Sequence, residues 1–322
     1  MKLALFGVSH WHAGMHAAAA RAAGAEIVAA WDLVAERAAE FAREHRCPAV
    51  GAVDEALALR PDLAVIMGRP AGMADLAQRF VAERLPVLVE KPVGVSGAVL
   101  RPLAEAAERQ GAFVAVALAH RVGPLPGEAR ALGQAGRLGV LSHSHFRLIN
   151  GPPERYVKDG CGWVLDPAVG GGGALRNLGI HGIDAFLGLA GEQDVAVEHA
   201  AFGRHLHGTP VEDYALVVLR AADGTIGLVE AGYTLASMTG SLFEWRVSAR
   251  NATLIDTGVR LQVATLDDGQ VRQLEATPLA RRYDTLMIDT IDRLRAGRKP
   301  AVSLMDHWRA MDLVDRCYAG GG

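Results

Sequence analysis

The chain has 322 residues, of which 50% are hydrophobic and 21% charged, and its formal net charge is −3. This length allows two domains with separate cores, and the composition is that of a globular protein. The charge balance argues against a nucleic-acid partner, and no apolar run reaches the roughly 18 residues that a membrane-spanning helix needs. The N-terminal apolar run is too short for a signal peptide, because polar residues 9–12 interrupt it. Three scattered cysteines favour a reducing cytoplasm.

The first ~120 residues alternate between strand and helix patterns, as a parallel sheet with crossover helices requires. We therefore predict an α/β fold that begins with a doubly wound parallel sheet and has six strand candidates. The predicted strands include residues 2–8, 26–31, 63–67, 85–89 and 112–119. The predicted helices are residues 11–23, 33–45, 71–84 and 96–110, the last with Ser96 as its N-cap and Gly111 at its end.

The pattern changes after Arg121, where the glycine- and proline-rich run 123–127 predicts a domain boundary. We expect one domain over residues 1–121 and a second over residues 122–322. Apolar and polar residues alternate along much of the second domain, which predicts a large, open, mainly antiparallel sheet. Its predicted strands are 140–149, 195–204, 213–220, 225–234, 243–249 and 252–256, and its helices are 172–189, 282–296 and 304–318.

The loop after the first strand resembles a degenerate dinucleotide-binding fingerprint. A full G-x-G-x-x-G would place glycines at positions 7, 9 and 12, but only Gly7 fits, with Ser9 and His12 in the other positions. Asp32 ends the second strand, where a carboxylate accepts from ribose hydroxyls and repels a 2′-phosphate. The order therefore favours NAD over NADP; the alternative is that Asp32 only caps the next helix. His10 and His12 could contact the cofactor or simply pack there.

Glu90-Lys91-Pro92 follows a short apolar run that predicts a buried parallel strand. Ligands of open α/β sheets bind outside the carboxyl ends of the strands. A lysine there can serve as a charge, a proton donor or a nucleophile, and a solvated lysine is the alternative. Arg69 follows the neighbouring strand and could contact a cofactor phosphate or remain at the surface.

In the second domain, four glycines at 170–173 open a predicted helix that carries Asn177, His181 and Asp184. The amides at such a helix start suit a polar or anionic ligand. Asn177 and His181 are four residues apart and should share a helix face. This arrangement is a candidate acid–base site, while a buried structural histidine is the alternative.

Several other side chains could line a substrate pocket. Trp163 could form its floor, because sugars stack on aromatic faces, although a core tryptophan is an equal alternative. Arg147 and Asn150 follow the long strand, and Tyr156 and Lys158 lie in a loop that could close over substrate. The pairs His143/His145 and His205/His207 lack the further ligands that a metal needs, so we interpret them as sheet-face histidines and predict no metal.

Taken together, these motifs make the chain similar to the glucose-fructose oxidoreductase / inositol dehydrogenase / MocA family over nearly its whole length. The supporting residues are the nucleotide loop, Glu90-Lys91-Pro92, Arg121, Gly136-Arg137-Leu138-Gly139, the glycine-led helix with His181 and Asp184, and Glu212-Asp213-Tyr214. The resemblance implies a Rossmann domain, a second α/β domain whose sheet buries its free face in a homodimer or homotetramer, and hydride transfer to or from a sugar, polyol or related hydroxyl compound.

The resemblance also implies site residues. The catalytic set would be Lys91, His181 and Asn177, with Asn177 standing where the family usually has aspartate. The cofactor-binding set would be Gly7, Ser9, His10, His12, Asp32, Arg69, Glu90, Lys91 and Arg121. The substrate-binding set would be Lys91, Arg147, Trp163, Asp166, Asn177 and His181.

We therefore expect an NAD-dependent oxidoreductase that acts on a secondary hydroxyl of a sugar, polyol or sugar-like acid. A non-catalytic sensor that binds nucleotide and sugar is one alternative, motivated by Asn177 and the degenerate glycine loop. A redox-neutral enzyme that reduces NAD only transiently is another.

Overall fold

The computed structural model describes residues 1–267 and 269–320, and the chain folds into two compact units. Unit 1 contains Met1–Ala119, Tyr156–Gly171 and Tyr283–Arg309, and unit 2 contains the remaining described residues. The first change of unit, between Ala119 and His120, lies close to the boundary expected after residue 121. Two later segments of the chain also contribute to unit 1.

Unit 1 is built on a parallel sheet with the strand order β2-β1-β3-β4-β5. The strands are β1 (Lys2–Phe6), β2 (Glu26–Trp31), β3 (Leu63–Ile66), β4 (Val87–Val89) and β5 (Val114–Val116). Every residue of β3, β4 and β5 is buried, as expected when helices cover both faces of a parallel sheet. The parallel α/β prediction is confirmed, but the described sheet has five strands, not six.

The helices of unit 1 mostly lie where the sequence predicts them. They are α1 (Ala13–Ala22), α2 (Ala35–His45), α3 (Val53–Ala58), α4 (Pro70–Ala82), α5 (Gly97–Gln110), α7 (Glu154–Lys158, from Tyr156), η2 (Gly162–Leu165), α8 (Pro167–Gly170) and most of α10 (Arg282–Arg295). The Ser96 hydroxyl accepts from the Val99 amide at 3.3 Å, and Gly111 ends the same helix at φ +61°, so both predicted caps of α5 are confirmed. The short helices α3, α7, η2 and α8 were not predicted, and the expectation that Tyr156 and Lys158 lie in a loop is wrong, because both are on α7.

Unit 2 is built on an eight-stranded sheet with the order β13-β12-β11-β10-β6-β9-β8-β7. Only β6 and β9 pair in parallel, so the prediction of a mainly antiparallel sheet is confirmed. The strands are β6 (Leu141–Asn150), β7 (Val195–Gly203), β8 (Tyr214–Ala221), β9 (Ile226–Gly232), β10 (Ser241–Ala249), β11 (Ala252–Asp256), β12 (Arg260–Thr265) and β13 (Val271–Glu275). The last two strands were not predicted.

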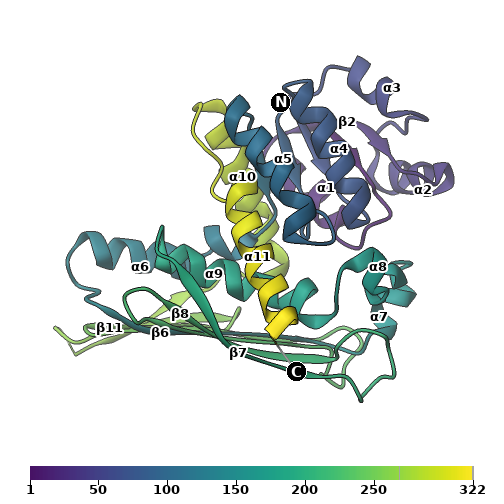
Figure 1. The fold of residues 1–322 in the computed structure, drawn as a ribbon. Coiled ribbons are helices and arrows are strands. Elements are labelled where there is room, and N and C mark those ends of the chain that lie inside the picture. The colour runs from purple at the N-terminus through teal and green to yellow at the C-terminus, as the bar shows by residue number, and fades with distance from the viewer. Residues whose placement is uncertain (268, 321–322) are drawn as a thin grey trace. The chain divides into compact units, whose positions relative to one another are not determined.

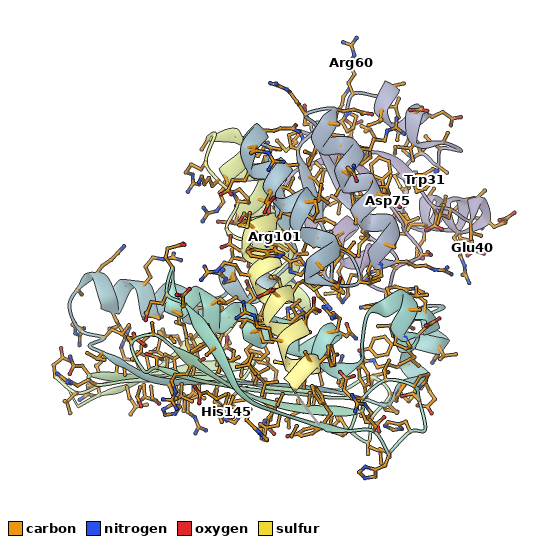
Figure 2. The ribbon with its side chains drawn as sticks, viewed as in Figure 1. Trp31, Glu40, Arg60, Asp75, Arg101 and His145 are labelled. Atoms are coloured by element: carbon orange, nitrogen blue, oxygen red, sulfur yellow. The ribbon has the colours of Figure 1, made fainter. Side chains whose placement is uncertain are left out.

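Helices cover one face of the unit 2 sheet. They include α6 (Pro124–Gln134) and α9 (Ile180–Ala190), which lie above the broad sheet in Figure 1. Gly182 packs tightly against the sheet, because a Cβ there would lie 2.8 Å from both the Phe146 ring and a Val229 methyl. His145 alternates with Phe146 along β6 and points to the uncovered face (Figure 2).

The described residues contain no helix long and apolar enough to cross a membrane. Among them we also find no cluster of three or more His, Cys, Asp or Glu side chains that could hold a metal ion. Helix α11 (Leu304–Gly320) belongs to unit 1 up to Arg309 and to unit 2 from Ala310 onward.

Candidate nucleotide and catalytic site

The carboxyl ends of β1 and β2 form the predicted nucleotide end of unit 1. Gly7 has φ +76°, and a Cβ at this position would overlap the carbonyl oxygen of Met67, so the backbone there accepts only glycine. The Asp32 carboxylate accepts from the Ser9 amide at 2.8 Å and from the Val34 amide at 3.0 Å. Val34, not Asp32, is the N-cap of α2. Asp32 thus ties the loop after β1 to the end of β2, and the helix-cap alternative does not describe it.

This end of unit 1 has features that fit a dinucleotide. His10 is buried, and its Nδ1 accepts from the His12 amide at 3.2 Å, which leaves the proton on Nε2. That Nε2 group is buried and has no hydrogen-bond partner among the described residues. Burial, and then the neighbouring His12, hold the pKa of His10 well below its usual value, so the ring is a neutral donor. Gly7, His10 and Asp32 are therefore suited to hold the phosphates and ribose of NAD.

Glu90 follows β4 and is completely buried in a hydrogen-bonded cluster of unit 1. Its Oε1 accepts from Tyr283 Oη at 2.7 Å, from His16 Nε2 at 2.8 Å and from His12 Nδ1 at 3.1 Å. Its Oε2 accepts from the Lys91 amide at 3.1 Å. Burial alone would raise the pKa of Glu90, but His12 and His16 outweigh this effect and hold it well below its usual value. Glu90 is therefore a buried carboxylate anion.

Lys91 lies beside this anion and is only 2% exposed. Burial lowers the pKa of its ammonium group to about 8, although the charge of Glu90 acts in the opposite direction. A lysine with such a pKa can give and take a proton near neutral pH, as acid–base catalysis requires. The alternative of a solvated lysine after the strand is therefore wrong.

An aromatic cluster covers the loop after β1 within unit 1. Trp11 stacks on His10 with ring centroids 3.9 Å apart and on Trp163 with centroids 5.7 Å apart. The buried Tyr156 meets the Trp11 ring edge-on at 5.3 Å. The Cys161 thiol lies 3.5 Å from the Ser9 carbonyl oxygen. The segment from Tyr156 to Gly171 therefore packs on the predicted nucleotide loop, while Lys158 in it is exposed.

In unit 2, the predicted glycine-led helix begins with a π-helical turn, η3 (Leu175–Gly179). The Ile180 amide bonds back to the Leu175 carbonyl, five residues earlier. Asn177 lies on this turn, is buried, and donates from Nδ2 to the Tyr233 hydroxyl at 3.1 Å. π-Helical turns are rare and frequently occur at functional sites. The amide that replaces the family's usual aspartate therefore holds a buried tyrosine.

The amides at the start of this helix are already occupied. The buried Glu212 carboxylate accepts from the amides of Gly173 and Leu175 at 3.0 and 2.9 Å, and from Tyr318 Oη at 2.7 Å. The expectation that these amides bind an external polar or anionic ligand is wrong, because a carboxylate of the chain itself takes their place.

His181 is buried on α9, and its ring meets the edge of His120 with centroids 5.1 Å apart. Arg282 donates to Nδ1 of His120 at 2.6 Å and to Asp256 at 2.7 Å. Because a guanidinium only donates, His120 is neutral and carries its proton on Nε2. Arg121, predicted to contact the cofactor, makes an ion pair with Asp184 at 3.1 Å.

The remaining predicted site residues lie on a sheet face or cap helices. Arg147 shares the uncovered face of β6 with His145, so the structure does not bring it to the helix that carries His181. Arg69 is an exposed N-cap residue of α4, and Asp166 caps α8 by accepting from the Ala168 amide at 2.9 Å. His145 bonds Glu230 on the sheet face, as expected, but His205 and His207 follow the end of β7 and are not strand residues.

Sequence reasoning missed several residues of these clusters, among them His16, Glu212, Tyr233 and Tyr283. Glu212 was noted only as part of a family-like strand. His16 lies two helical positions beyond the nucleotide loop, and its apolar alanine neighbours on α1 were the available signal that it is buried. Tyr283 gave no signal, because it lies 193 residues from Glu90 along the chain.

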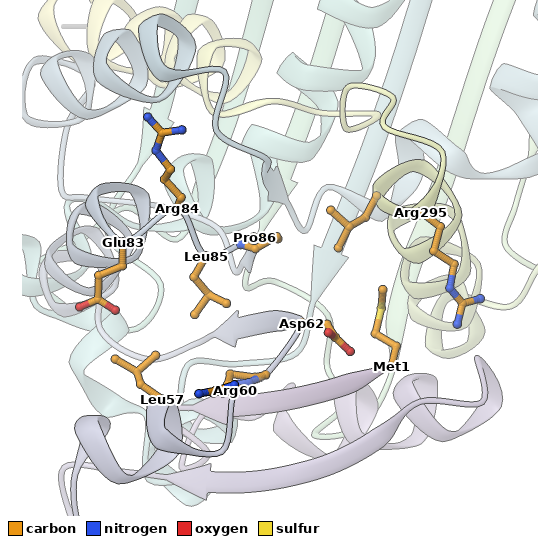
Figure 3. A pocket seen from close by; sticks show the side chains of 11 residues that line it. Met1, Leu57, Arg60, Asp62, Glu83, Arg84, Leu85, Pro86 and Arg295 are labelled. Atoms are coloured by element: carbon orange, nitrogen blue, oxygen red, sulfur yellow. The ribbon is translucent and has the colours of Figure 1, made fainter.

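A hollow of about 710 Å³ lies at the opposite edge of the unit 1 sheet (Figure 3). Met1, Asp62 and Pro86, which line it, precede strands β1, β3 and β4. The hollow is therefore at the amino ends of the strands, away from the end where ligands of open α/β sheets bind. Its charged residues have both signs, and we assign it no role.

The fold and these clusters define a dinucleotide-binding α/β protein. Residues 1–118 match the family model for the "Oxidoreductase family, NAD-binding Rossmann fold", and residues 127–254 match the "GFO/IDH/MocA C-terminal domain". The two models together cover most of the chain, which belongs to the Gfo/Idh/MocA family of NAD-binding oxidoreductases.

Curated relatives agree with this family over part of the chain. The rhizopine catabolism protein MocA of Rhizobium meliloti is 29% identical over 174 residues, which cover 52% of this chain and 51% of the relative. The trans-1,2-dihydrobenzene-1,2-diol dehydrogenase of Oryctolagus cuniculus is 32% identical over 203 residues, covering 62% and 58%. The chain thus spans little more than half the length of these relatives.

Solved structures share the fold. Levoglucosan dehydrogenase, in complex with NADH and levoglucosan, superposes with a TM-score of 0.85 at 17% identity, covering 99% of this chain and 96% of that one. GenD2 from gentamicin A biosynthesis, in complex with NAD, superposes with a TM-score of 0.81 at 21% identity, covering 99% and 93%. At these identities the likeness establishes the fold.

Proposed function

We propose that the protein is an NAD-dependent oxidoreductase that transfers hydride between nicotinamide and a secondary hydroxyl of a sugar, polyol or sugar-like acid. The observation that carries the proposal is Lys91, a buried lysine that follows the carboxyl end of β4, in the same parallel sheet in which Gly7 and Asp32 follow β1 and β2. The names of the relatives support the substrate class, since a dihydrodiol and levoglucosan both carry secondary hydroxyl groups.

Lys91 and His181 are the proposed catalytic residues. NAD, when bound, accepts the hydride from the carbon that bears the hydroxyl. Lys91 would hydrogen-bond the hydroxyl oxygen and stabilise the negative charge that develops on it. His181 would accept the hydroxyl proton. Asn177, which cannot ionise, would orient polar groups and leave His181 without a neighbouring anion at that position.

Asp32 supports the preference for NAD. Its carboxylate ends β2, where the ribose of a dinucleotide is held, and it would repel the 2′-phosphate of NADP. Arg37, the nearest arginine in the following helix, already pairs with Glu40 at 3.3 Å. A titration of the protein with each cofactor, read by tryptophan fluorescence, should give the tighter dissociation constant for NAD. Tighter binding of NADP would refute the preference.

The catalytic assignment is tested with Lys91→Ala and His181→Ala. Each should lower kcat by about 10²–10⁴-fold while NAD binding stays within a few fold. Lys299→Ala and His143→Ala are matched controls, because they remove the same side chains from exposed or sheet-face positions. Full activity in both catalytic variants would contradict the assignment.

A non-catalytic sensor is the second candidate, and the observation that favours it is Asn177 in the place of the family's usual aspartate. A sensor binds NAD and a sugar but forms no NADH with any hydroxyl compound. A redox-neutral enzyme forms product without net NADH and retains its cofactor. NADH formation, measured together with analysis of the product, therefore separates all three.

We also propose that the protein forms a homodimer or homotetramer through the uncovered sheet face, where Leu216, Val218 and Leu228 are only half-buried in the single chain. The cysteines Cys47, Cys161 and Cys317 are free thiols, which agrees with a reducing, cytoplasmic location. Sedimentation of the purified protein tests the first proposal: a monomer at micromolar concentration would contradict it.

A further inference from the structure

Three side-chain donors reach one oxygen of the buried Glu90 carboxylate, Oε1. His12 and His16 lie four residues apart at the start of α1, and Tyr283 comes from a separate segment of unit 1. The other oxygen bonds the backbone amide of Lys91. One carboxylate oxygen is thus bound by Tyr283, His16 and His12 (the triad), and the other by the backbone of Lys91.

Two of the three donors carry no charge at pH 7. Burial lowers the pKa of His12, so its ring is neutral at pH 7 and donates from Nδ1, shared between Glu90 and Tyr283 Oη at 2.7 Å. Nδ1 of His16 is buried and has no hydrogen-bond partner among the described residues, so His16 reaches Glu90 through Nε2 alone. Burial and then the charge of Glu90 raise the pKa of Tyr283 well above its usual value, which keeps its hydroxyl proton in place.

Hydrogen bonds donated to the carboxylate favour its ionised form. Glu90 is therefore held as an anion, and Lys91 is the lysine beside it. The other titratable groups that face the cluster are His10, from the loop after β1, and His307 on α11, whose Nε2 accepts from the Val93 amide at 3.1 Å. Neither supplies a compensating positive charge while it accepts on a ring nitrogen.

We propose that Tyr283, His12 and His16 are positioning residues for Lys91, which act through Glu90 by keeping one fixed negative charge beside the lysine amine. The inference rests on the proposed function, since it assigns the triad to the catalytic lysine. Without this charge, burial would drive Lys91 to its neutral form at pH 7. With it, both protonation states of Lys91 are accessible near neutral pH.

The test is a direct titration of Lys91 in the protein without cofactor. The sequence contains four lysines, Lys2, Lys91, Lys158 and Lys299, and only Lys91 is buried. Protein labelled with 13C at lysine Cε therefore gives four signals, and we expect the signal of Lys91 to titrate at about 8. Lys91→Ala assigns the displaced signal.

Three variants then separate positioning from folding. Glu90→Gln keeps the shape of the side chain and removes its charge, and should lower the Lys91 pKa by about 1–3 units. Titration of Glu90 at low pH should produce a second, acidic inflection in the titration curve of the Lys91 signal. Tyr283→Phe removes one donor to Glu90 and should raise the pH of this inflection by about 1 unit. Tyr214→Phe is the matched control: Tyr214 donates to Glu230 at 2.6 Å beside His145, on the uncovered sheet face, and its loss should move neither inflection.

A Lys91 signal near pH 10, or one that Glu90→Gln leaves in place, would overturn the inference whatever the enzyme's activity. Failure of the proposed function looks different: Lys91 titrates as expected, yet Lys91→Ala retains full turnover. The pH dependence of kcat/KM in Glu90→Gln gives the second readout, with its Lys91 limb displaced to lower pH by the same amount as the NMR signal.

Discussion

Two buried glutamates in this protein have different hydrogen-bond partners, and the difference distinguishes a glutamate of the proposed catalytic site from a structural glutamate. Glu90 in unit 1 receives three side-chain donors and one backbone amide, and lies beside Lys91. Glu212 in unit 2 receives two backbone amides and the hydroxyl of Tyr318. Each has a tyrosine at 2.7 Å. The charge of Glu212 stabilises backbone amides at the start of a helix, whereas the charge of Glu90 acts on the neighbouring amine of Lys91.

The largest effect on stability is expected at Glu212. Glu212→Ala leaves the amides of Gly173 and Leu175 and the Tyr318 hydroxyl without their acceptor, and should lower the free energy of unfolding by about 3–5 kcal/mol. Denaturant unfolding measures the loss. Glu198→Ala, at an exposed glutamate that pairs with Arg220, should change stability by less than about 0.5 kcal/mol. Equal effects of the two variants would show that the hydrogen bonds of Glu212 to these amides do not contribute to stability.

The second effect has the opposite sign and concerns Lys91. Its pKa is about 8 in the folded protein against 10.5 ordinarily, so the folded state releases a proton that the unfolded chain keeps between these values. The free energy of unfolding should therefore rise with pH from about 8 to 10.5, and the full cost of burying the ammonium group applies below pH 8.

Lys91→Met removes that cost. The variant should be more stable than the native protein by up to roughly 3 kcal/mol at pH 7, with the gain shrinking as pH approaches 10.5. Thermal unfolding at several pH values measures it. A variant that is less stable at pH 7 would show that Lys91 stabilises the fold, contrary to the expectation that the native protein is less stable because it contains Lys91.

The smallest effect compares the two tyrosines. Tyr283→Phe and Tyr318→Phe each remove one hydrogen bond to a buried carboxylate and should each cost about 1.5–3 kcal/mol of unfolding free energy. Only Tyr283→Phe should also change the pH dependence of turnover. If Tyr318→Phe moved the same pH limb, the distinction between the two glutamates would fail.

Much of the fold follows from local sequence signals. Strands β3, β4 and β5 are short, wholly apolar and rich in β-branched residues, and Ser96 and Gly111 mark the ends of α5 by their own chemistry. Strand ends also placed Asp32 and Lys91, because parallel strands of one sheet share a carboxyl edge. By contrast β13 escaped prediction because four of its five residues are exposed and its sequence does not alternate.

The interior of the site depends on contacts that no local pattern encodes. Tyr283 meets Glu90 across 193 residues and His16 meets it across 74, so neither partner can be read from spacing. The π-helical turn at Asn177 was likewise out of reach, since hydrophobic periodicity distinguishes periods of 2 and 3.6 and not one inserted residue. The sequence thus points to the charged residues of the candidate site, while tertiary packing determines their hydrogen-bond partners.

The most direct test of the proposed function is a turnover screen of the native protein with NAD against sugars, polyols and sugar acids, followed by the absorbance of NADH. We expect NADH formation with at least one secondary alcohol of this class, and loss of that signal in Lys91→Ala and His181→Ala while Lys299→Ala retains it. NAD binding without NADH formation for any compound, or turnover that survives in both catalytic variants, would contradict it.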